Sequence, residues 1–181
     1  MLAAPPPLRQ RFRIKVISMG EPGVGKSCLI KRYCEKKFVS KYISTIGIDF
    51  GMKPVMVDSL DVRVNLFDLA GGDHYLEIRN EFYKEAEGAI LVFDVNSKSS
   101  FVGLEKWLDE AQKYGAKDYI AILCGNKTDI KKRVVSEQEA QSWASSKGFR
   151  YFETSANTGD GVDQAFTFLI NTVAQKCKPP H

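Results

Sequence analysis

Residues 20–27 form a glycine-rich loop, Gly-Glu-Pro-Gly-Val-Gly-Lys-Ser, whose flanks restrict how the chain can fold. The apolar stretch 12–19 before the loop predicts a buried strand, and residues 28–36 after it predict a helix with one apolar face. A strand, a glycine-rich loop and a helix N-terminus in this order surround an anion with backbone N–H groups. The loop therefore predicts a phosphate-binding site in a fold of the α/β class.

The last residues of the loop carry the chemistry. Lys26 is expected to place a positive charge at the β- and γ-phosphates of a nucleotide, and Ser27 offers a hydroxyl ligand to Mg²⁺. The alternative, a glycine turn beside a surface lysine, does not account for the strand and helix on either side. The residues expected to contact phosphate are Gly23, Val24, Gly25, Lys26, Ser27 and Cys28.

Length and composition fit one globular domain. The chain has 181 residues, of which 44% are hydrophobic and 27% charged, and its formal charge of +4 is too small to indicate nucleic-acid binding. We expect a disordered proline-rich N-terminus over residues 1–10, one domain over 11–176 and a flexible tail over 177–181. The four scattered cysteines favour buried thiols in a reducing compartment over a zinc site or disulfides.

Strand-like and helix-like segments alternate along the domain. Six segments have the apolar content or alternation of strands, and alternating elements of this kind predict a mostly parallel six-stranded sheet flanked by about five helices. The strands are expected at residues 12–19, 48–57, 62–69, 89–95, 119–124 and 149–153, and helices at 28–36, 101–114, 136–146 and 162–174.

Asp68 and Gly71 close the third expected strand as Asp-Leu-Ala-Gly. An aspartate at a strand end beside the phosphate loop can hold Mg²⁺, directly or through water. Gly71 has no Cβ, so its N–H can approach a γ-phosphate. Thr45 is expected to add a hydroxyl to the Mg²⁺ ligands and its N–H to the γ-phosphate.

The motif Asn-Lys-Thr-Asp follows the fifth strand and contains Asn126, Lys127 and Asp129. We expect it to select the base of the nucleotide. A carboxylate at Asp129 accepts hydrogen bonds from the N1–H and the exocyclic amine of guanine, whereas adenine has no donor at N1. Asn126 can join this loop to the phosphate loop, and the Lys127 stem can cover the base. The motif argues against an adenine-nucleotide kinase or ATPase.

Further nucleotide contacts are expected from two loops. The loop after the last strand has small residues whose N–H groups can meet the guanine O6. The residues concerned are Ser155, Ala156 and Asn157, together with Phe38 and Tyr42 in the segment before the second strand.

These loops, in this order, resemble the Ras superfamily of small GTPases from about residue 12 to 176, which implies a G domain that binds GTP or GDP with Mg²⁺. Residues 45–50, Thr-Ile-Gly-Ile-Asp-Phe, are similar to the Rab branch. Residues 14–20, 31–36 and 79–84 are closer still to the Rab-like GTPases named for an attached J domain. No J domain is expected within these 181 residues.

The chain departs from the family at Gly72, where active members have a glutamine that orients the attacking water. Glycine has no side chain for this role, so slow hydrolysis is expected, with Lys26 and Thr45 as the remaining catalytic residues. Asp73 and His74 are the nearest substitutes, although both are also ordinary solvated loop residues. Pro22 removes one N–H from the phosphate loop, with an effect on hydrolysis of unknown sign.

Two functions stay open: a switch that cycles between GTP and GDP, and a largely GTP-locked scaffold with negligible turnover. In either case segments 38–50 and 71–83 are expected to bind effectors. An exchange factor and a GTPase-activating protein are further expected partners. A candidate apolar patch, equally compatible with core positions, comprises Ile46, Ile48, Phe50, Phe67 and Tyr83.

The C-terminal residues, which include Cys177, do not match a prenylation pattern. No lipid anchor is therefore expected in this chain, which we expect to be a monomer. The cysteine usage, with no signal core and no run long enough for a transmembrane helix, predicts a cytoplasmic or nuclear protein. The resemblance implies the ciliary base as a further location.

Overall fold

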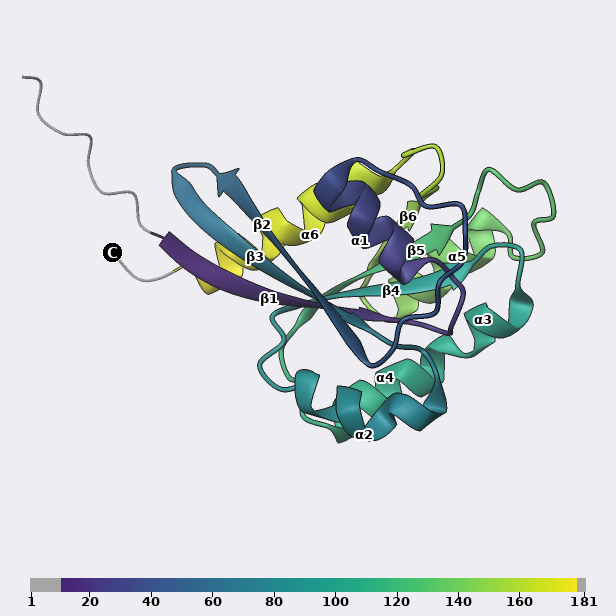
Figure 1. The fold of residues 1–181 in the computed structure, drawn as a ribbon, viewed down its shortest axis with the longest axis horizontal. Helices are drawn as coiled ribbons and strands as arrows, with labels where there is room; N and C mark the ends of the chain where they lie inside the picture. The colour runs from purple at the N-terminus through teal and green to yellow at the C-terminus, as the bar shows by residue number, and fades with distance from the viewer. Residues whose placement is uncertain (1–10, 179–181) are drawn as a thin grey trace, which may run out of the picture.

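The computed structural model describes residues 11–178, which form a three-layer α/β fold (Figure 1). Six strands make one sheet in the order β2-β3-β1-β4-β5-β6. The β2 strand pairs antiparallel with β3, and the other neighbouring strands pair parallel. The expected mostly parallel α/β sheet is confirmed. The strands are β1 (Arg11–Met19), β2 (Ile48–Val57), β3 (Leu60–Leu69), β4 (Gly88–Asp94), β5 (Ile120–Asn126) and β6 (Arg150–Glu153).

Helices cover both faces of the sheet. Helices α1 and α6 pack on one face, and α4 and α5 pack on the other (Figure 1). The helices are α1 (Lys26–Glu35), α2 (Leu76–Arg79), α3 (Lys98–Val102), α4 (Leu104–Lys113), α5 (Glu137–Ser146) and α6 (Val162–Cys177). Two 3₁₀ turns, η1 (Asp73–Tyr75) and η2 (Asn80–Phe82), flank α2. The expected tail residue Cys177 ends α6, whereas residues 1–10 and 179–181 lie outside the described part.

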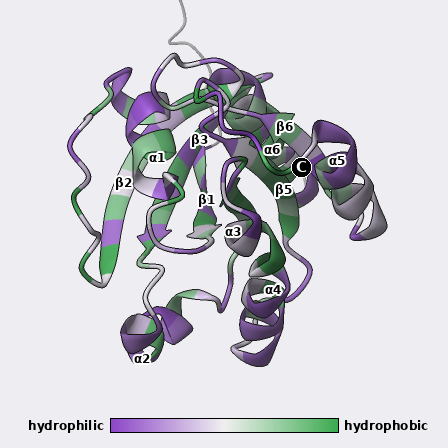
Figure 2. Cartoon of the chain, turned by 90° about the vertical axis from the view of Figure 1, so that its right-hand side faces the viewer, coloured by the Kyte–Doolittle hydropathy of each residue, from purple (hydrophilic) through white to green (hydrophobic). Residues whose placement is uncertain are grey.

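The central strands are apolar because they are buried on both faces. In β4, Ile90 and Val92 face α1 and α6, while Leu91 and Phe93 face α4 and α5. In Figure 2, hydrophobic residues run along the strands, whereas hydrophilic residues cover much of α2, α4 and α5. Within residues 11–178, no helix is both long enough and apolar enough to cross a membrane.

The prediction of a single helix over residues 101–114 is wrong. The structure has two helices there, α3 and α4, which meet at Gly103. A Cβ at Gly103 would lie 2.7 Å from the Glu21 carboxylate, so the phosphate loop packs closely against this junction. Trp107, in α4, is a core residue, and its Nε1–H donates to Glu21 at 3.3 Å. The half-buried Trp143 packs against Phe101.

The thiols are less buried than expected. Among the four cysteines, Cys124 is fully buried, while Cys28, Cys34 and Cys177 are half-buried. Burial raises the pKa of Cys124 to about 12. All four are free thiols.

Candidate functional site

The glycine-rich loop connects β1 to α1 and opens at the carboxyl edge of the sheet, where ligands of open α/β folds bind. Its turn into the helix depends on Gly25, whose φ of 102° is left-handed. A Cβ at this position would also lie 2.3 Å from the Asn126 amide nitrogen. Glycine is therefore required here both for backbone conformation and for contact with the loop after β5.

Lys26 lies under this loop with only 6% of its surface exposed. Its ammonium donates to the carbonyls of Gly20 at 2.8 Å and Glu21 at 3.0 Å. Burial lowers the pKa of Lys26 to about 8, although the charges of Asp68 and Glu21 act in the opposite direction. The ammonium is thus held by the loop that is expected to surround the phosphates.

Three side-chain oxygens converge beside Lys26. The Ser27 hydroxyl lies 2.8 Å from the Thr45 hydroxyl and donates to the Asp68 carboxylate, which also accepts from Thr45 at 3.4 Å. Hydroxyl and carboxylate oxygens are the donors that Mg²⁺ prefers. The residues present therefore fit a magnesium ion.

A buried hydroxyl that the sequence reasoning missed orients this group. Ser18, 1% exposed in β1, donates to the other oxygen of Asp68 at 2.8 Å and accepts from the Leu69 N–H at 3.1 Å. A small polar residue within the apolar run at residues 16–19 was the available signal.

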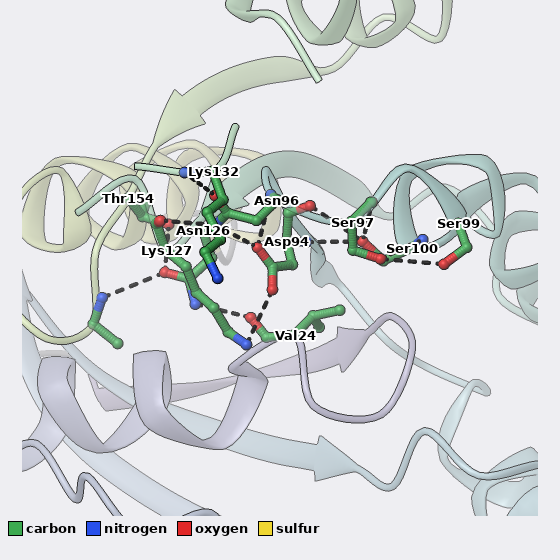
Figure 3. Close-up of polar contacts among 11 residues, drawn as sticks. Val24, Asp94, Asn96, Ser97, Ser99, Ser100, Asn126, Lys127, Lys132 and Thr154 are labelled. Carbon is green, nitrogen blue, oxygen red and sulfur yellow. Dashed lines mark hydrogen bonds and ion pairs between the residues drawn. The ribbon is translucent and has the colours of Figure 1, made fainter. Parts of the chain in front are cut away.

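Asn126 connects the base loop to the phosphate loop, as Figure 3 shows. Its side-chain N–H donates to the Val24 carbonyl at 2.9 Å. Its side-chain oxygen accepts from the Thr154 hydroxyl at 3.2 Å and from the Ala156 N–H at 3.3 Å. One amide thereby fixes three loops relative to one another.

The Asp129 carboxylate lies at the other end of the site. The Ser155 hydroxyl donates to one of its oxygens at 2.8 Å, and the Asn157 amide donates to the other at 3.0 Å. The hydrogen bond from Asn157 and then that from Ser155 lower the pKa of Asp129 below its ordinary value. The carboxylate is thus ionised at neutral pH and able to accept hydrogen bonds from a base edge.

Lys127 has a partner that the motif did not reveal. Its ammonium pairs with the Asp94 carboxylate at 3.1 Å, and its carbonyl accepts from the Asn96 amide at 3.2 Å (Figure 3). Lys127 itself has a left-handed φ of 64°. The loop between β4 and α3 therefore holds this strained lysine in place.

One cavity of about 420 Å³ is lined by Lys26, Ser27, Thr45, Asn126 and Asp129. It brings together most of the expected nucleotide residues, including Phe38, Tyr42 and Gly72. Val24, Asp68 and Ser155 do not line it; they lie behind the wall, where they bond to Asn126, Ser27 and Asp129. Lining residues that the motifs did not indicate are Val39, Ser40, Ile43, Ser44, Tyr75 and Ile130.

The expected apolar patch needs one correction. Ile46 is 82% exposed and Phe50 is 56% exposed, but Tyr83 is fully buried and belongs to the core. Phe82, one residue earlier, takes its place: the Phe67 ring lies 5.1 Å from the Phe50 ring and 5.3 Å from the Phe82 ring. We call Phe50, Phe67 and Phe82 the aromatic row.

Arg79 anchors segment 71–83 to α4 from within the core. Its guanidinium, fully buried, donates two hydrogen bonds to the Glu110 carboxylate at 2.5 and 2.8 Å. Its remaining nitrogen donates to the carbonyls of Ala70 at 3.0 Å and Gly72 at 2.5 Å. The Tyr83 hydroxyl also donates to Glu110, at 2.6 Å.

Sequence comparison with known proteins points to the same kind of site. The sequence profile of the Ras family matches residues 15–175. The chain is 54% identical to DnaJ homolog subfamily C member 27 of Homo sapiens over 169 residues, 90% of this chain and 62% of the relative. It is 47% identical to the protein of the same name from Danio rerio over 176 residues, 94% of this chain and 64% of the relative. The chain thus spans less than two thirds of the length of these curated relatives.

These matches confirm the expected resemblance to Rab-like GTPases that have a J domain. The motifs, the sheet order and the profile agree over almost the whole domain. The chain belongs to the Ras family of small GTPases.

Proposed function

We propose that this chain is a guanine-nucleotide switch that binds GTP and GDP with Mg²⁺ and hydrolyses GTP slowly. The observation that carries the proposal is the single cavity that joins the phosphate loop to the Asp129 carboxylate. Lys26 lies at one end, and a carboxylate oriented by Ser155 and Asn157 lies at the other. A cavity lined both by a phosphate loop with its lysine and by an oriented carboxylate suits a nucleotide with a guanine base and a phosphate tail.

Each group has a separate part in binding and turnover. Backbone N–H groups of the loop and the Lys26 ammonium bind the phosphates, and Ser27, Thr45 and Asp68 would hold Mg²⁺. When bound, the metal neutralises phosphate charge. Gly72 lines the cavity without a side chain, so nothing at that position orients water, and hydrolysis is slow.

Calorimetry and a single-turnover assay test this proposal. We expect purified protein with Mg²⁺ to bind GDP and GTP but not ATP, and to hydrolyse GTP slower than a Rab with glutamine at the position of Gly72. Ser27→Asn should weaken GTP more than GDP, because it removes a hydroxyl metal ligand. The proposal would be refuted if calorimetry detected no heat of binding for GDP and none for GTP.

The second candidate, a GTP-locked scaffold, is favoured by Gly72 together with the Arg79 anchor, which restrains segment 71–83. The same time course separates the two functions. Conversion of bound GTP within hours supports the switch, whereas retention of GTP over days supports the scaffold.

We also propose that effectors bind the aromatic row, in segments 38–50 and 71–83 and the β3 residue between them. The row continues from exposed Phe50 on β2, the last residue of segment 38–50, to Phe82 in η2, which belongs to segment 71–83. Phe50→Ala should abolish capture of any partner that GTP-loaded, but not GDP-loaded, protein retains. Val102→Ala, a similarly exposed apolar residue on α3, is the control. Equal capture by both variants would contradict this surface.

A further inference from the structure

The imidazole of His74 lies directly against Gly72. A Cβ built at this position would lie 2.6 Å from Cε1 and 2.9 Å from Nδ1 of His74. The imidazole therefore stands where a side chain at position 72 would begin. This is the position from which a glutamine orients water in active relatives.

His74 shares its cavity with the groups expected at the γ-phosphate. Lys26, Thr45 and Gly71 line the same space. The imidazole packs against the Tyr75 ring, with centroids 4.0 Å apart and planes inclined by 45°. Tyr75 also lines the cavity, so the two rings form one wall of it.

The backbone that carries His74 is anchored from the opposite side. The Gly72 carbonyl accepts hydrogen bonds from Arg79 at 2.5 Å and from the Tyr75 N–H at 3.1 Å. The neighbouring Asp73 carboxylate turns outward and pairs with Lys106 of α4 at 2.5 Å. Asp73 is therefore engaged elsewhere, and this turn lines the cavity with His74 and Tyr75.

We propose that the His74 imidazole orients the attacking water in GTP hydrolysis and so replaces the absent glutamine. The inference rests on the proposed function and deepens it. A neutral imidazole has one nitrogen that accepts a hydrogen bond, which can hold a water molecule through one O–H. The water oxygen forms a bond to the γ-phosphorus, and the bond from that phosphorus to the bridging oxygen breaks. GDP leaves with the electron pair, the water proton passes to phosphate or solvent, and His74 is unchanged.

Three variants test this role by single-turnover hydrolysis of bound GTP. His74→Ala should slow hydrolysis about 10- to 100-fold, the order of one hydrogen bond made in the transition state. GTP and GDP affinities should stay within about twofold, because His74 is assigned to the water and not to the phosphates. His74→Gln, which keeps an acceptor, should restore part of the rate, and Asp73→Asn should leave it unchanged.

A spectroscopic measurement gives a second readout. The chain has two histidines, His74 and His181, so its imidazole NMR spectrum is simple. The His74 signal, identified by its loss in His74→Ala, should shift when a non-hydrolysable GTP analogue replaces GDP, whereas the His181 signal should not.

The outcomes separate this inference from the proposed function. If the protein binds GTP but His74→Ala hydrolyses it at the wild-type rate, only the role of His74 is refuted. The same holds if the His74 NMR signal does not shift when the GTP analogue replaces GDP. Measurable GTP binding without any hydrolysis also refutes it. If the wild-type protein does not bind GTP, both proposals fail.

Discussion

Glu110→Ala should lower the free energy of unfolding by about 3–5 kcal/mol, the usual cost of breaking a buried ion pair. The variant removes the carboxylate that accepts two hydrogen bonds from the fully buried Arg79 guanidinium and leaves it only the carbonyls of Ala70 and Gly72. It also leaves the buried Tyr83 hydroxyl without the acceptor that lies 2.6 Å away. Urea denaturation at fixed nucleotide and Mg²⁺ concentrations measures the change, since bound ligand itself adds stability.

Glu139→Ala is the matched control. Glu139 forms an ion pair with Lys98, but both side chains are well exposed, at 41% and 51%. Exposed pairs contribute about 1 kcal/mol or less, so this variant should be nearly neutral. Equal losses in the two variants would mean that the Arg79–Glu110 pair does not anchor segment 71–83. Combining Arg79→Ala with Glu110→Ala should cost less than the sum of the two single changes.

Asp129→Asn should weaken GDP binding on the order of 10²- to 10⁴-fold, because two hydrogen bonds to a charged group are worth ~1.5–3 kcal/mol each. The amide presents an N–H where the base edge of guanine also presents donors. Xanthine has a carbonyl in place of the exocyclic amine, so affinity for xanthosine diphosphate should rise. Competition between the two diphosphates, measured by fluorescence displacement, gives the ratio directly.

Asp163→Asn controls for the loss of a carboxylate. Asp163 pairs with Lys36 at 2.5 Å and does not line the cavity. Its replacement should leave the preference for guanine intact. An unchanged preference in Asp129→Asn itself would show that another group selects the base.

The sequence predicted the sheet well because strand burial leaves a local pattern. The expected bounds of β2 were correct, and the apolar runs of β4 and β5 reflect burial on both faces. The nucleotide loops were identifiable because each motif directly follows a strand. The close packing of Glu21 against Gly103 leaves no pattern in the sequence around residues 101–114. The sequence therefore did not predict that two helices meet at Gly103.

Contacts between residues that are far apart in the sequence could not be predicted either. Arg79 and Glu110 are 31 positions apart, and each, considered alone, looks like a solvated charge on a short helix. Tyr83 and Phe82 are adjacent aromatics, and only packing decides which faces Glu110 and which faces Phe67. Asp94 likewise gave no indication that it would bind Lys127.

The amide of Asn126 touches three loops at once, and this has a thermodynamic consequence for ligands. Because one side chain links the two halves of the pocket, ordering either half by a fragment prepares the other. Guanosine and pyrophosphate should therefore bind cooperatively as separate molecules, and the intact nucleotide gains a chelate advantage that neither fragment has alone.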